Sequence, residues 1–180
     1  MSPHDLVESQ PAWLEEDELQ DVRGKVPMVY VEAVPVRLDH LGRIEKVGLL
    51  LTAQPDGSVS RAVVSGRVLY NETLRDALWR HLTKDLGPDA DPNIPPGVAP
   101  FTVAEYFPEE GRSGFHDPRQ HAVALGYVVP CDGECRPARN ALDLSWLSPS
   151  EAVSPDVAAE MSQGHGRLVR RALAYCGQLP

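Results

Sequence analysis

The stretch that decides the fold reads Gly66-Arg-Val-Leu-Tyr-Asn-Glu72-Thr-Leu-Arg-Asp-Ala-Leu-Trp-Arg80-His-Leu-Thr-Lys-Asp-Leu-Gly87. Within it, Leu74, Leu78 and Leu82 recur every four residues, so one side of a helix is apolar. Residues 71–73 offer N-capping side chains, and Gly87-Pro88 is a strong stop signal. The stretch therefore predicts an amphipathic helix of about four turns.

The residues before this helix, 60–65, read Ser-Arg-Ala-Val-Val-Ser and predict a short buried strand. Gly66 then opens the connection to the helix, and a glycine has no side chain to keep a phosphate or a metal away from the backbone. The predicted order is therefore a strand, a glycine-led loop and a helix.

This order and spacing resemble the Nudix box, whose pattern is G-x5-E-x7-R-E-U-x-E-E-x-G-U, where U is a bulky apolar residue. The positions in register are Gly66, Glu72, Arg80, Leu82 and Gly87. The departures are His81 in place of a glutamate, Lys84-Asp85 in place of the Glu-Glu pair, and Pro88 in place of the last apolar residue. The chain thus resembles a divergent Nudix protein with a degenerate box.

The resemblance implies an α+β fold, an α/β/α sandwich in which a mixed β-sheet is flanked by helices. It also implies metal-dependent hydrolysis of a nucleoside diphosphate linked to another moiety, such as ADP-ribose or a nucleotide sugar. Mg²⁺ or Mn²⁺ would neutralise charge and polarise water in this reaction, and Mg²⁺ prefers carboxylate oxygens. The loss of two helix carboxylates predicts low activity, because they would stabilise the transition state.

The resemblance also assigns roles to single residues. Asp85 aligns with a metal-binding position, and we expect Glu105 to assist it as a second metal ligand. Asp85, His81 and Glu72 are the catalytic candidates, although Glu72 is expected mainly to bond Arg80 and so to fix the loop to the helix. A solvated Asp85 and a His81 with no chemical role are the alternatives. The predicted substrate-binding residues are Gly66, Arg67, Arg80, Lys84 and Arg119.

Arg119 belongs to a second notable segment, His116-Asp-Pro-Arg-Gln-His121. It resembles a segment of Nudix domains that handle ADP-ribose-like compounds, including some ligand-sensing regulators. Asp-Pro fixes a turn, and Arg119 can offer a bidentate donor to a phosphate or a carboxylate. The alternative is an Arg–Asp pair that holds the loop.

Three functions stay open at this point. The first is a hydrolase of low activity that uses Mg²⁺ or Mn²⁺. The second is a Nudix-fold protein that binds a nucleotide or sugar phosphate without cleaving it, with Lys84 supplying positive charge in place of metal. The third is a dimeric interaction scaffold whose contacts are the surface around Trp13 and the C-terminal helix. A homodimer is expected.

The composition narrows the partners and the location. A net charge of −9 argues against general nucleic-acid binding, but not against a nucleotide ligand. No apolar run approaches the roughly 18 residues that cross a bilayer, so no membrane partner is expected. The start of the chain lacks the pattern of a signal peptide, which predicts a cytoplasmic protein. Cys131 and Cys135 are expected to be reduced thiols at a hairpin tip.

The expected organisation is an N-terminal extension over 1–25 and a single Nudix-like domain over 26–180. The extension should carry a short helix over 13–22, after a mobile stretch over 1–10. Pro27 and Pro35 predict that the strand over 26–38 has an edge position or a bulge. The other predicted elements are strands over 46–53, 101–107, 121–129 (a central strand) and 141–147, turns over 39–42 and 54–57, and helices after Ser148 and over 166–176.

Overall fold

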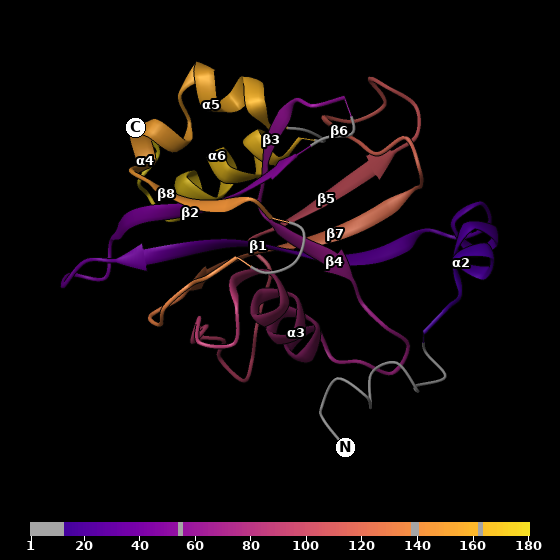
Figure 1. Ribbon diagram of the computed structural model, residues 1–180, viewed down its shortest axis with the longest axis horizontal. Helices are drawn as coiled ribbons and strands as arrows, with labels where there is room; N and C mark the ends of the chain where they lie inside the picture. Colours follow the sequence, from indigo (N-terminus) through magenta and orange to yellow (C-terminus); the bar gives the residue numbers. More distant parts are fainter. Residues whose placement is uncertain (1–12, 54–55, 138–140, 162–163) are drawn as a thin grey trace.

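The computed structural model describes residues 13–53, 56–137, 141–161 and 164–180, with helices on both faces of one mixed β-sheet (Figure 1). This architecture confirms the predicted α+β sandwich. The predictions for residues 1–10 and for the first half of the 54–57 turn lie outside the described residues. In chain order the elements are α2 (Glu16–Arg23), β1 (Met28–Leu38), β2 (Ile44–Ala53), β3 (Val59–Ala62), β4 (Val64–Arg67), α3 (Leu74–Leu86), β5 (Thr102–Phe107), β6 (Phe115–His116), β7 (Ala122–Pro130), β8 (Asp143–Leu147), α4 (Pro149–Ala152), α5 (Pro155–Glu160) and α6 (His165–Tyr175).

The strand order in the sheet is β3-β2-β1-β7-β5-β6, with β4 paired to β1 and β8 paired to β2. β1 and β7 run parallel, from the pair Met28 and Ala122 to the pair Val36 and Pro130. β7 also pairs with β5 on its other side, so the strand predicted over 121–129 is central, as expected. The remaining pairings in this sheet are antiparallel except for β5 with β6.

The edge position predicted for the strand over 26–38 is wrong, because β1 has partners on both sides. One side pairs with β7, and the other pairs with β4 at residues 30–33 and with β2 at residues 36–38. Pro35 falls between these last two partners, where its missing N–H is not needed by a ladder. A register shift typical of a bulge occurs between Arg37 and Leu38.

Two further predictions need correction. The strand predicted over 60–65 divides at Val63 into β3 and β4, which pair with β2 and β1 respectively. The expected hairpin around Cys131 and Cys135 does not form, because β8 pairs with β2 and not with β7. Both cysteines are free thiols; Cys131 is buried and Cys135 is partly buried.

The sheet separates two apolar cores. On one face, Leu78 and Leu82 of α3 pack against β1, β4 and β7. On the other face, Leu168 and Leu173 of α6 pack against the opposite side chains of β1, β5 and β7. Each of these leucines is almost fully buried, which contributes about 1.5–3 kcal/mol per side chain. The two helices therefore hold opposite faces of one scaffold.

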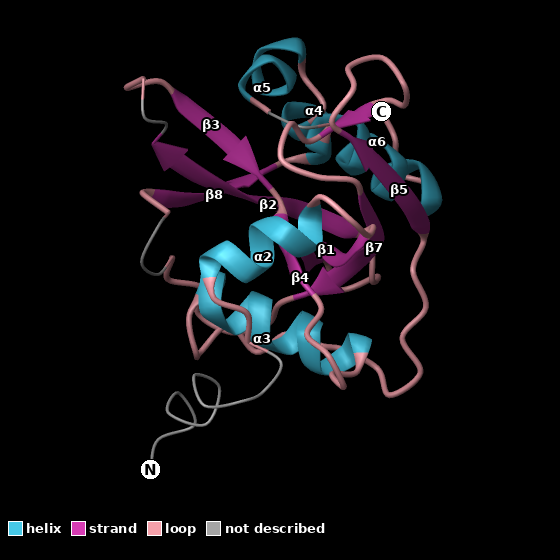
Figure 2. Ribbon diagram, turned by 90° about the vertical axis from the view of Figure 1, so that its right-hand side faces the viewer, coloured by secondary structure: helices cyan, strands magenta, loops and turns pink. Residues whose placement is uncertain are grey.

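Helix α2 lies at one end of the sheet, in front of β1, β4 and β7 in Figure 2. Its first turn is acidic, and Glu15 and Glu18 form a capping box at its start. Arg23 in its last turn donates from Nε to Gln120 Oε1 at 3.1 Å, which ties α2 to the start of β7. Within the part of the chain that the structure describes, every helix is too short or too polar to cross a membrane.

Candidate functional site

The segment that decides the fold forms the predicted strand, loop and helix. β4 ends at Arg67, and α3 begins after Thr73, whose hydroxyl accepts a hydrogen bond from the Asp76 backbone N–H at 3.1 Å. The helix ends at Gly87, whose φ of 95° favours glycine. Arg136 packs against this end, since its backbone N–H donates to Leu86 O at 2.7 Å. Both ends of α3 are thus fixed by local contacts.

The loop and the helix are joined by Glu72 and Arg80. Arg80 donates from Nε to Glu72 Oε1 at 2.7 Å and from Nη2 to Oε2 at 2.8 Å. Glu72 also accepts from the Leu69 backbone N–H at 2.9 Å, and Arg80 donates to Arg67 O at 3.0 Å. The pKa of Glu72 is lowered, because these hydrogen bonds outweigh the effect of burial, which alone would raise it. This is the predicted ion pair between the loop and the helix, and it occupies both carboxylate oxygens of Glu72.

His81 is buried beneath the backbone of Gly66. A Cβ atom at Gly66 would lie 1.9 Å from His81 Cε1, so the imidazole needs a glycine at this position. His81 Nε2 lies 2.9 Å from Arg67 O, which must accept, while Nδ1 has no hydrogen-bond partner among the described residues. Burial lowers the pKa of His81 to about 4. The ring is therefore neutral near pH 7 and holds the helix against β4.

Lys84 and Asp85 occupy the positions of the missing Glu-Glu pair. Their charged atoms are 3.9 Å apart, and the Lys84 side chain is 53% exposed whereas that of Asp85 is 21% exposed. Burial raises the pKa of Asp85, and the positive charge of Lys84 opposes this effect. The exposed charge on this part of α3 is consequently a cation and not a carboxylate cluster.

The donor set around α3 does not fit Mg²⁺ or Mn²⁺. Glu72 is occupied by Arg80, His81 is turned into the core, and Lys84 repels a cation beside Asp85. Glu105 is exposed on β5, where it pairs with Val123 of β7. Among the residues described, no three His, Cys, Asp or Glu side chains form a group able to hold a metal ion. The structure thus brings Glu72 and Arg80 together, and metal binding by Asp85 with Glu105 stays a prediction.

Arg67 ends β4 at the start of the glycine-led loop, and its side chain is partly buried. Its guanidinium makes no hydrogen bond or ion pair with the described part of the chain, and burial lowers its pKa. Arg80, Arg23, Tyr30 and Glu72 also act on this pKa, so these side chains lie around Arg67. Arg67 is therefore available to an anion from outside the protein.

Arg119 also lies near Tyr30, but unlike Arg67 it is paired with a carboxylate, that of Asp117. It donates from Nε to Asp117 Oδ1 at 3.0 Å and from Nη2 to Oδ2 at 2.9 Å. Gln120 donates to the same carboxylate at 3.0 Å, which supports the alternative in which this segment holds its own loop. The Arg119 side chain is nevertheless 52% exposed. Tyr30 influences the pKa values of both Arg67 and Arg119, which places these two arginines around one tyrosine.

Sequence reasoning did not identify Tyr30 or Arg23 as neighbours of this site. Tyr30 pairs with Arg67 across β1 and β4, and Arg23 reaches the region from α2. Neither residue belongs to a motif, and their positions depend on strand register and on helix docking. No pattern in the sequence signals either of them.

A family model described as "Domain of unknown function (DUF4916)" matches residues 9–178 of the chain. Among curated proteins, none matches. The chain is 54% identical to a protein from Jonesia denitrificans that is described as a possible asymmetric diadenosine tetraphosphate (Ap4A) hydrolase. The match covers 87% of this chain and 98% of that one, with a TM-score of 0.85.

More distant structures share the fold. A NUDIX hydrolase from Nitrosomonas europaea is 13% identical, with a TM-score of 0.61 over 86% of this chain and 92% of that one. The NUDIX domain of NrtR from Shewanella oneidensis, in complex with ADP ribose, is 16% identical, with a TM-score of 0.57 over 97% of this chain and 98% of that one. These two similarities establish the architecture around α3.

Proposed function

The chain belongs to the Nudix hydrolase superfamily and, within it, to the family described as a domain of unknown function (DUF4916), and on this premise we propose that it binds a nucleoside diphosphate derivative through cationic side chains. One observation carries the proposal. In the second half of α3 the exposed side chain at the box positions is the cation Lys84, while the glutamate of the box is occupied by Arg80. The site is therefore suited to hold a diphosphate directly and poorly suited to hold a divalent metal.

The diphosphate would lie along the loop and the second half of α3. Lys84 supplies an exposed ammonium, and Arg67 supplies a guanidinium without a partner among the described residues. Arg80 lies one helical turn before Lys84 and also acts on the pKa of Arg67, so its side chain lies between Lys84 and Arg67 along the site. Phosphate oxygens form charge-assisted hydrogen bonds with both groups, which are stronger than neutral ones. Arg119 would contribute from its exposed side.

A second candidate function is slow hydrolysis of the same class of ligand. Asp85 keeps a carboxylate at a box position, and the Jonesia denitrificans relative is described as a possible Ap4A hydrolase. The donor set around α3 argues against efficient turnover. Location in the cytoplasm and assembly as a homodimer stay predictions.

The test is a calorimetric titration of the full chain with ADP-ribose and with diadenosine tetraphosphate, in EDTA and again with Mn²⁺. We expect binding in EDTA, with Lys84→Gln and Arg67→Gln each weakening it about tenfold, because each removes one charge-assisted contact. Arg75→Gln is the matched control, since Arg75 is an exposed cation near the start of the same helix.

The same mixtures are then analysed for products. Binding that requires Mn²⁺, or cleavage that requires Mn²⁺ and is abolished by Asp85→Ala, would replace the binding proposal with the hydrolase candidate. Equal weakening by Arg75→Gln would mean that only the net charge of the protein matters.

A further inference from the structure

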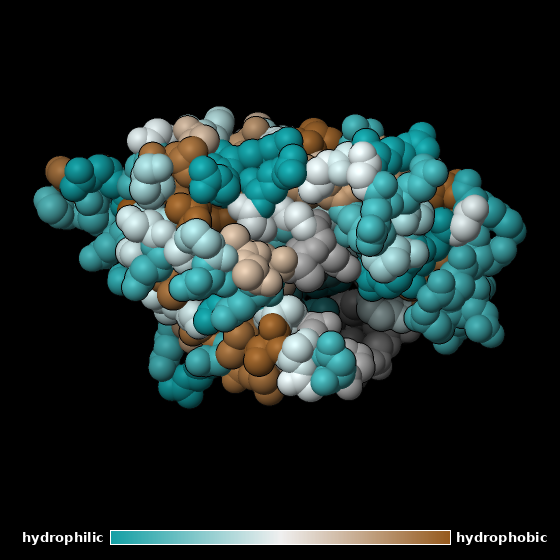
Figure 3. All heavy atoms as spheres, turned by 90° about the horizontal axis from the view of Figure 1, so that it is seen from above, coloured by the Kyte–Doolittle hydropathy of each residue, from teal (hydrophilic) through white to brown (hydrophobic). Residues whose placement is uncertain are grey.

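The sheet face opposite α3 carries a pocket that no residue of the 66–87 segment lines. Its volume is about 600 Å³, and it lies over α6 between β6 and the helices α4 and α5. Pockets that bind small molecules commonly have volumes of about 300–1,000 Å³. From above, this face is a patchwork of hydrophilic and hydrophobic residues and not one continuous apolar surface (Figure 3). Its form therefore fits a small molecule better than a flat protein partner.

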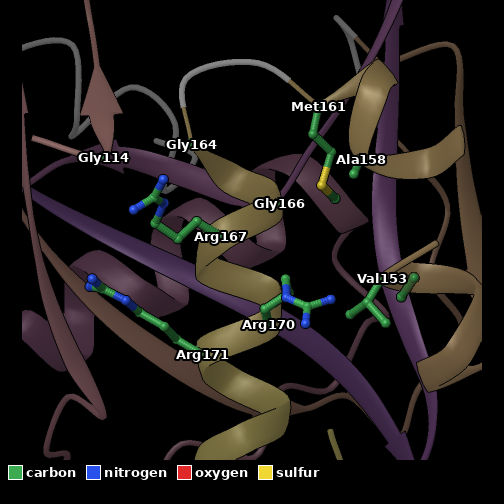
Figure 4. Close-up of a pocket in the computed structure, with 10 residues that line it drawn as sticks. Gly114, Val153, Ala158, Met161, Gly164, Gly166, Arg167, Arg170 and Arg171 are labelled. Atoms are coloured by element: carbon green, nitrogen blue, oxygen red, sulfur yellow. The ribbon is translucent and has the colours of Figure 1, made fainter. Parts of the chain in front are cut away.

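Three arginines from α6 line the pocket: Arg167, Arg170 and Arg171. Arg167 and Arg171 are four residues apart and share one side of α6, whereas Arg170 does not lie on that side. In Figure 4, Arg167 extends toward Gly114, whereas Arg170 extends toward Val153 on the other side. The pocket is thus positively charged along its length, in a protein whose net charge is −9.

These charges are not balanced by neighbouring acids. No ion pair among the described residues involves any of the three arginines, and Arg171 makes a 3.3 Å hydrogen bond with Thr102 Oγ1. On the adjacent helices, Glu160 pairs with Arg61 and Glu151 accepts from Ser148, while Asp156 of α5 forms no ion pair with the described residues. The guanidinium of Arg171 also lies over the Phe115 ring, 5.1 Å from its centroid. Guanidinium groups without an acidic partner attract an anion, because Arg presents a planar set of donors that matches phosphate oxygens.

A glycine leaves room for Arg167 at the pocket, and a buried carboxylate fixes the first turn of α6. A Cβ atom at Gly114 would lie 2.3 Å from Arg167 Nη1, so a glycine allows this guanidinium to lie against the β6 segment. His165, the first residue of α6, places Nε2 at 3.3 Å from Glu32 Oε1 in the core. Tyr106 holds the same carboxylate from Oη at 2.8 Å. The first turn of α6, which carries Arg167, is thereby fixed before any ligand binds.

We propose that this pocket binds a phosphorylated small molecule with an apolar or aromatic body. The phosphate would lie between Arg167 and Arg171. The body would lie against the apolar wall formed by Val153, Ala158 and Met161, with Arg170 beside it. A guanidinium can stack on a planar ring as well as pair with a phosphate.

This site is separate from the one formed by the glycine-led loop and α3. The two lie on opposite faces of the sheet and share no residue, so either proposal can fail without the other. The ligand of the pocket is also distinguished by needing no divalent metal and no diphosphate.

The experiment uses phenyl phosphate as the probe, because it combines a phosphate with an aromatic body. Amide NMR spectra of the full ¹⁵N-labelled chain report on each site through its own glycines. We expect shifts at Gly114, Gly164 and Gly166, and none at Gly66 or Gly87. The double variant Arg167→Gln/Arg171→Gln should weaken binding at least tenfold, whereas Arg75→Gln, an exposed arginine on α3, should leave the dissociation constant within twofold.

Phenol and inorganic phosphate separate the two parts of the ligand. We expect each alone to bind at least tenfold more weakly than phenyl phosphate. Shifts confined to Gly66 and Gly87 would overturn the proposal, as would phenol binding equal to that of phenyl phosphate. A folded double variant that binds as tightly as the unaltered chain would also overturn it.

Discussion

His81 on α3 and His165 on α6 are both buried, on opposite faces of the same sheet. His81 Nε2 meets a backbone carbonyl, that of Arg67, and its Nδ1 has no hydrogen-bond partner in the part of the chain that the structure describes. His165 uses both nitrogens, because Nε2 lies 3.3 Å from Glu32 Oε1 and Nδ1 accepts from the Val63 backbone N–H at 3.4 Å. One imidazole mainly fills space, and the other anchors a helix in a polar network.

This difference explains how the two faces can carry different chemistry. On the α3 face, His81 stands where the Nudix pattern has a glutamate, and it packs into the core. The helix therefore keeps its position although this carboxylate is absent. On the α6 face, a buried carboxylate fixes the start of the helix and leaves the arginines of its outer side free. The predictions below test this contrast.

Gly66→Ala should have the largest effect. The new Cβ would overlap the imidazole of His81, and both lie in the core, so neither can move away easily. We expect a loss of about 3 kcal/mol or more in the free energy of unfolding, measured by urea denaturation. Gly97→Ala is the control, because a Cβ there meets nothing within 4 Å.

The double variant Gly66→Ala/His81→Ala sharpens this prediction. If the clash is the cause, removing the imidazole should recover part of the lost stability, and the two changes should be non-additive. Strict additivity would show that Gly66 matters for another reason, such as the conformation of β4.

The second prediction concerns pH. The pKa of His81 is lowered from 6.5 to about 4 in the folded protein. The unfolded chain therefore takes up a proton below about pH 6.5, whereas the folded chain resists it until about pH 4. Stability should fall as the pH falls through this window, by about 3 kcal/mol from His81 alone. Denaturant titrations at several pH values measure this loss.

His81→Gln is the matched variant for the pH measurement. Glutamine can still donate to Arg67 O but does not titrate, so the stability of the variant should vary less with pH between about 4 and 6.5. The other histidines contribute equally to both proteins. Parallel curves for the variant and the unaltered chain would contradict a buried, neutral His81.

Glu32→Gln tests the polar network on the opposite face. The amide keeps the shape of the carboxylate but loses its charge toward His165 and Tyr106. We expect a loss of about 2 kcal/mol in the free energy of unfolding, because charged hydrogen bonds contribute more than neutral ones. Ser65→Ala is the control, since its contact with Glu32 is long, at 3.4 Å. If Glu32→Gln leaves the free energy of unfolding unchanged, apolar packing alone holds α6.

Lys84→Glu should have the smallest energetic effect but the clearest chemical one. It replaces an exposed cation beside Asp85 by a second carboxylate. We expect at least tenfold tighter Mn²⁺ binding, about 1.4 kcal/mol, measured by electron paramagnetic resonance. Lys84→Gln is the control that removes charge without adding a ligand. Equal Mn²⁺ affinity in the unaltered chain and Lys84→Glu would show that Lys84 does not limit metal binding.

Much of the fold could be predicted from local patterns. The leucine spacing of α3, its Thr73 cap and its Gly87 end are local signals, and the helix forms where they indicate. The pairing of Glu72 with Arg80 also follows from the spacing of the box. Of the two alternatives that the prolines of β1 predicted, the bulge agrees with the register shift after Arg37, and the edge position is wrong. Pro35 lies at the change of partner from β4 to β2, which depends on the pairing of several strands.

The sequence by itself determined the superfamily and the replacement of carboxylates by His81 and Lys84, because short-range periodicity and spacing fix a helix and the residues it carries. Only the tertiary structure decided that His81 is buried under Gly66. It also decided that Arg67 lies beside Tyr30 and that α6 presents its arginines to a pocket. These relations join residues that are distant in the chain, and they arise from sheet register and from the packing of helices on opposite faces.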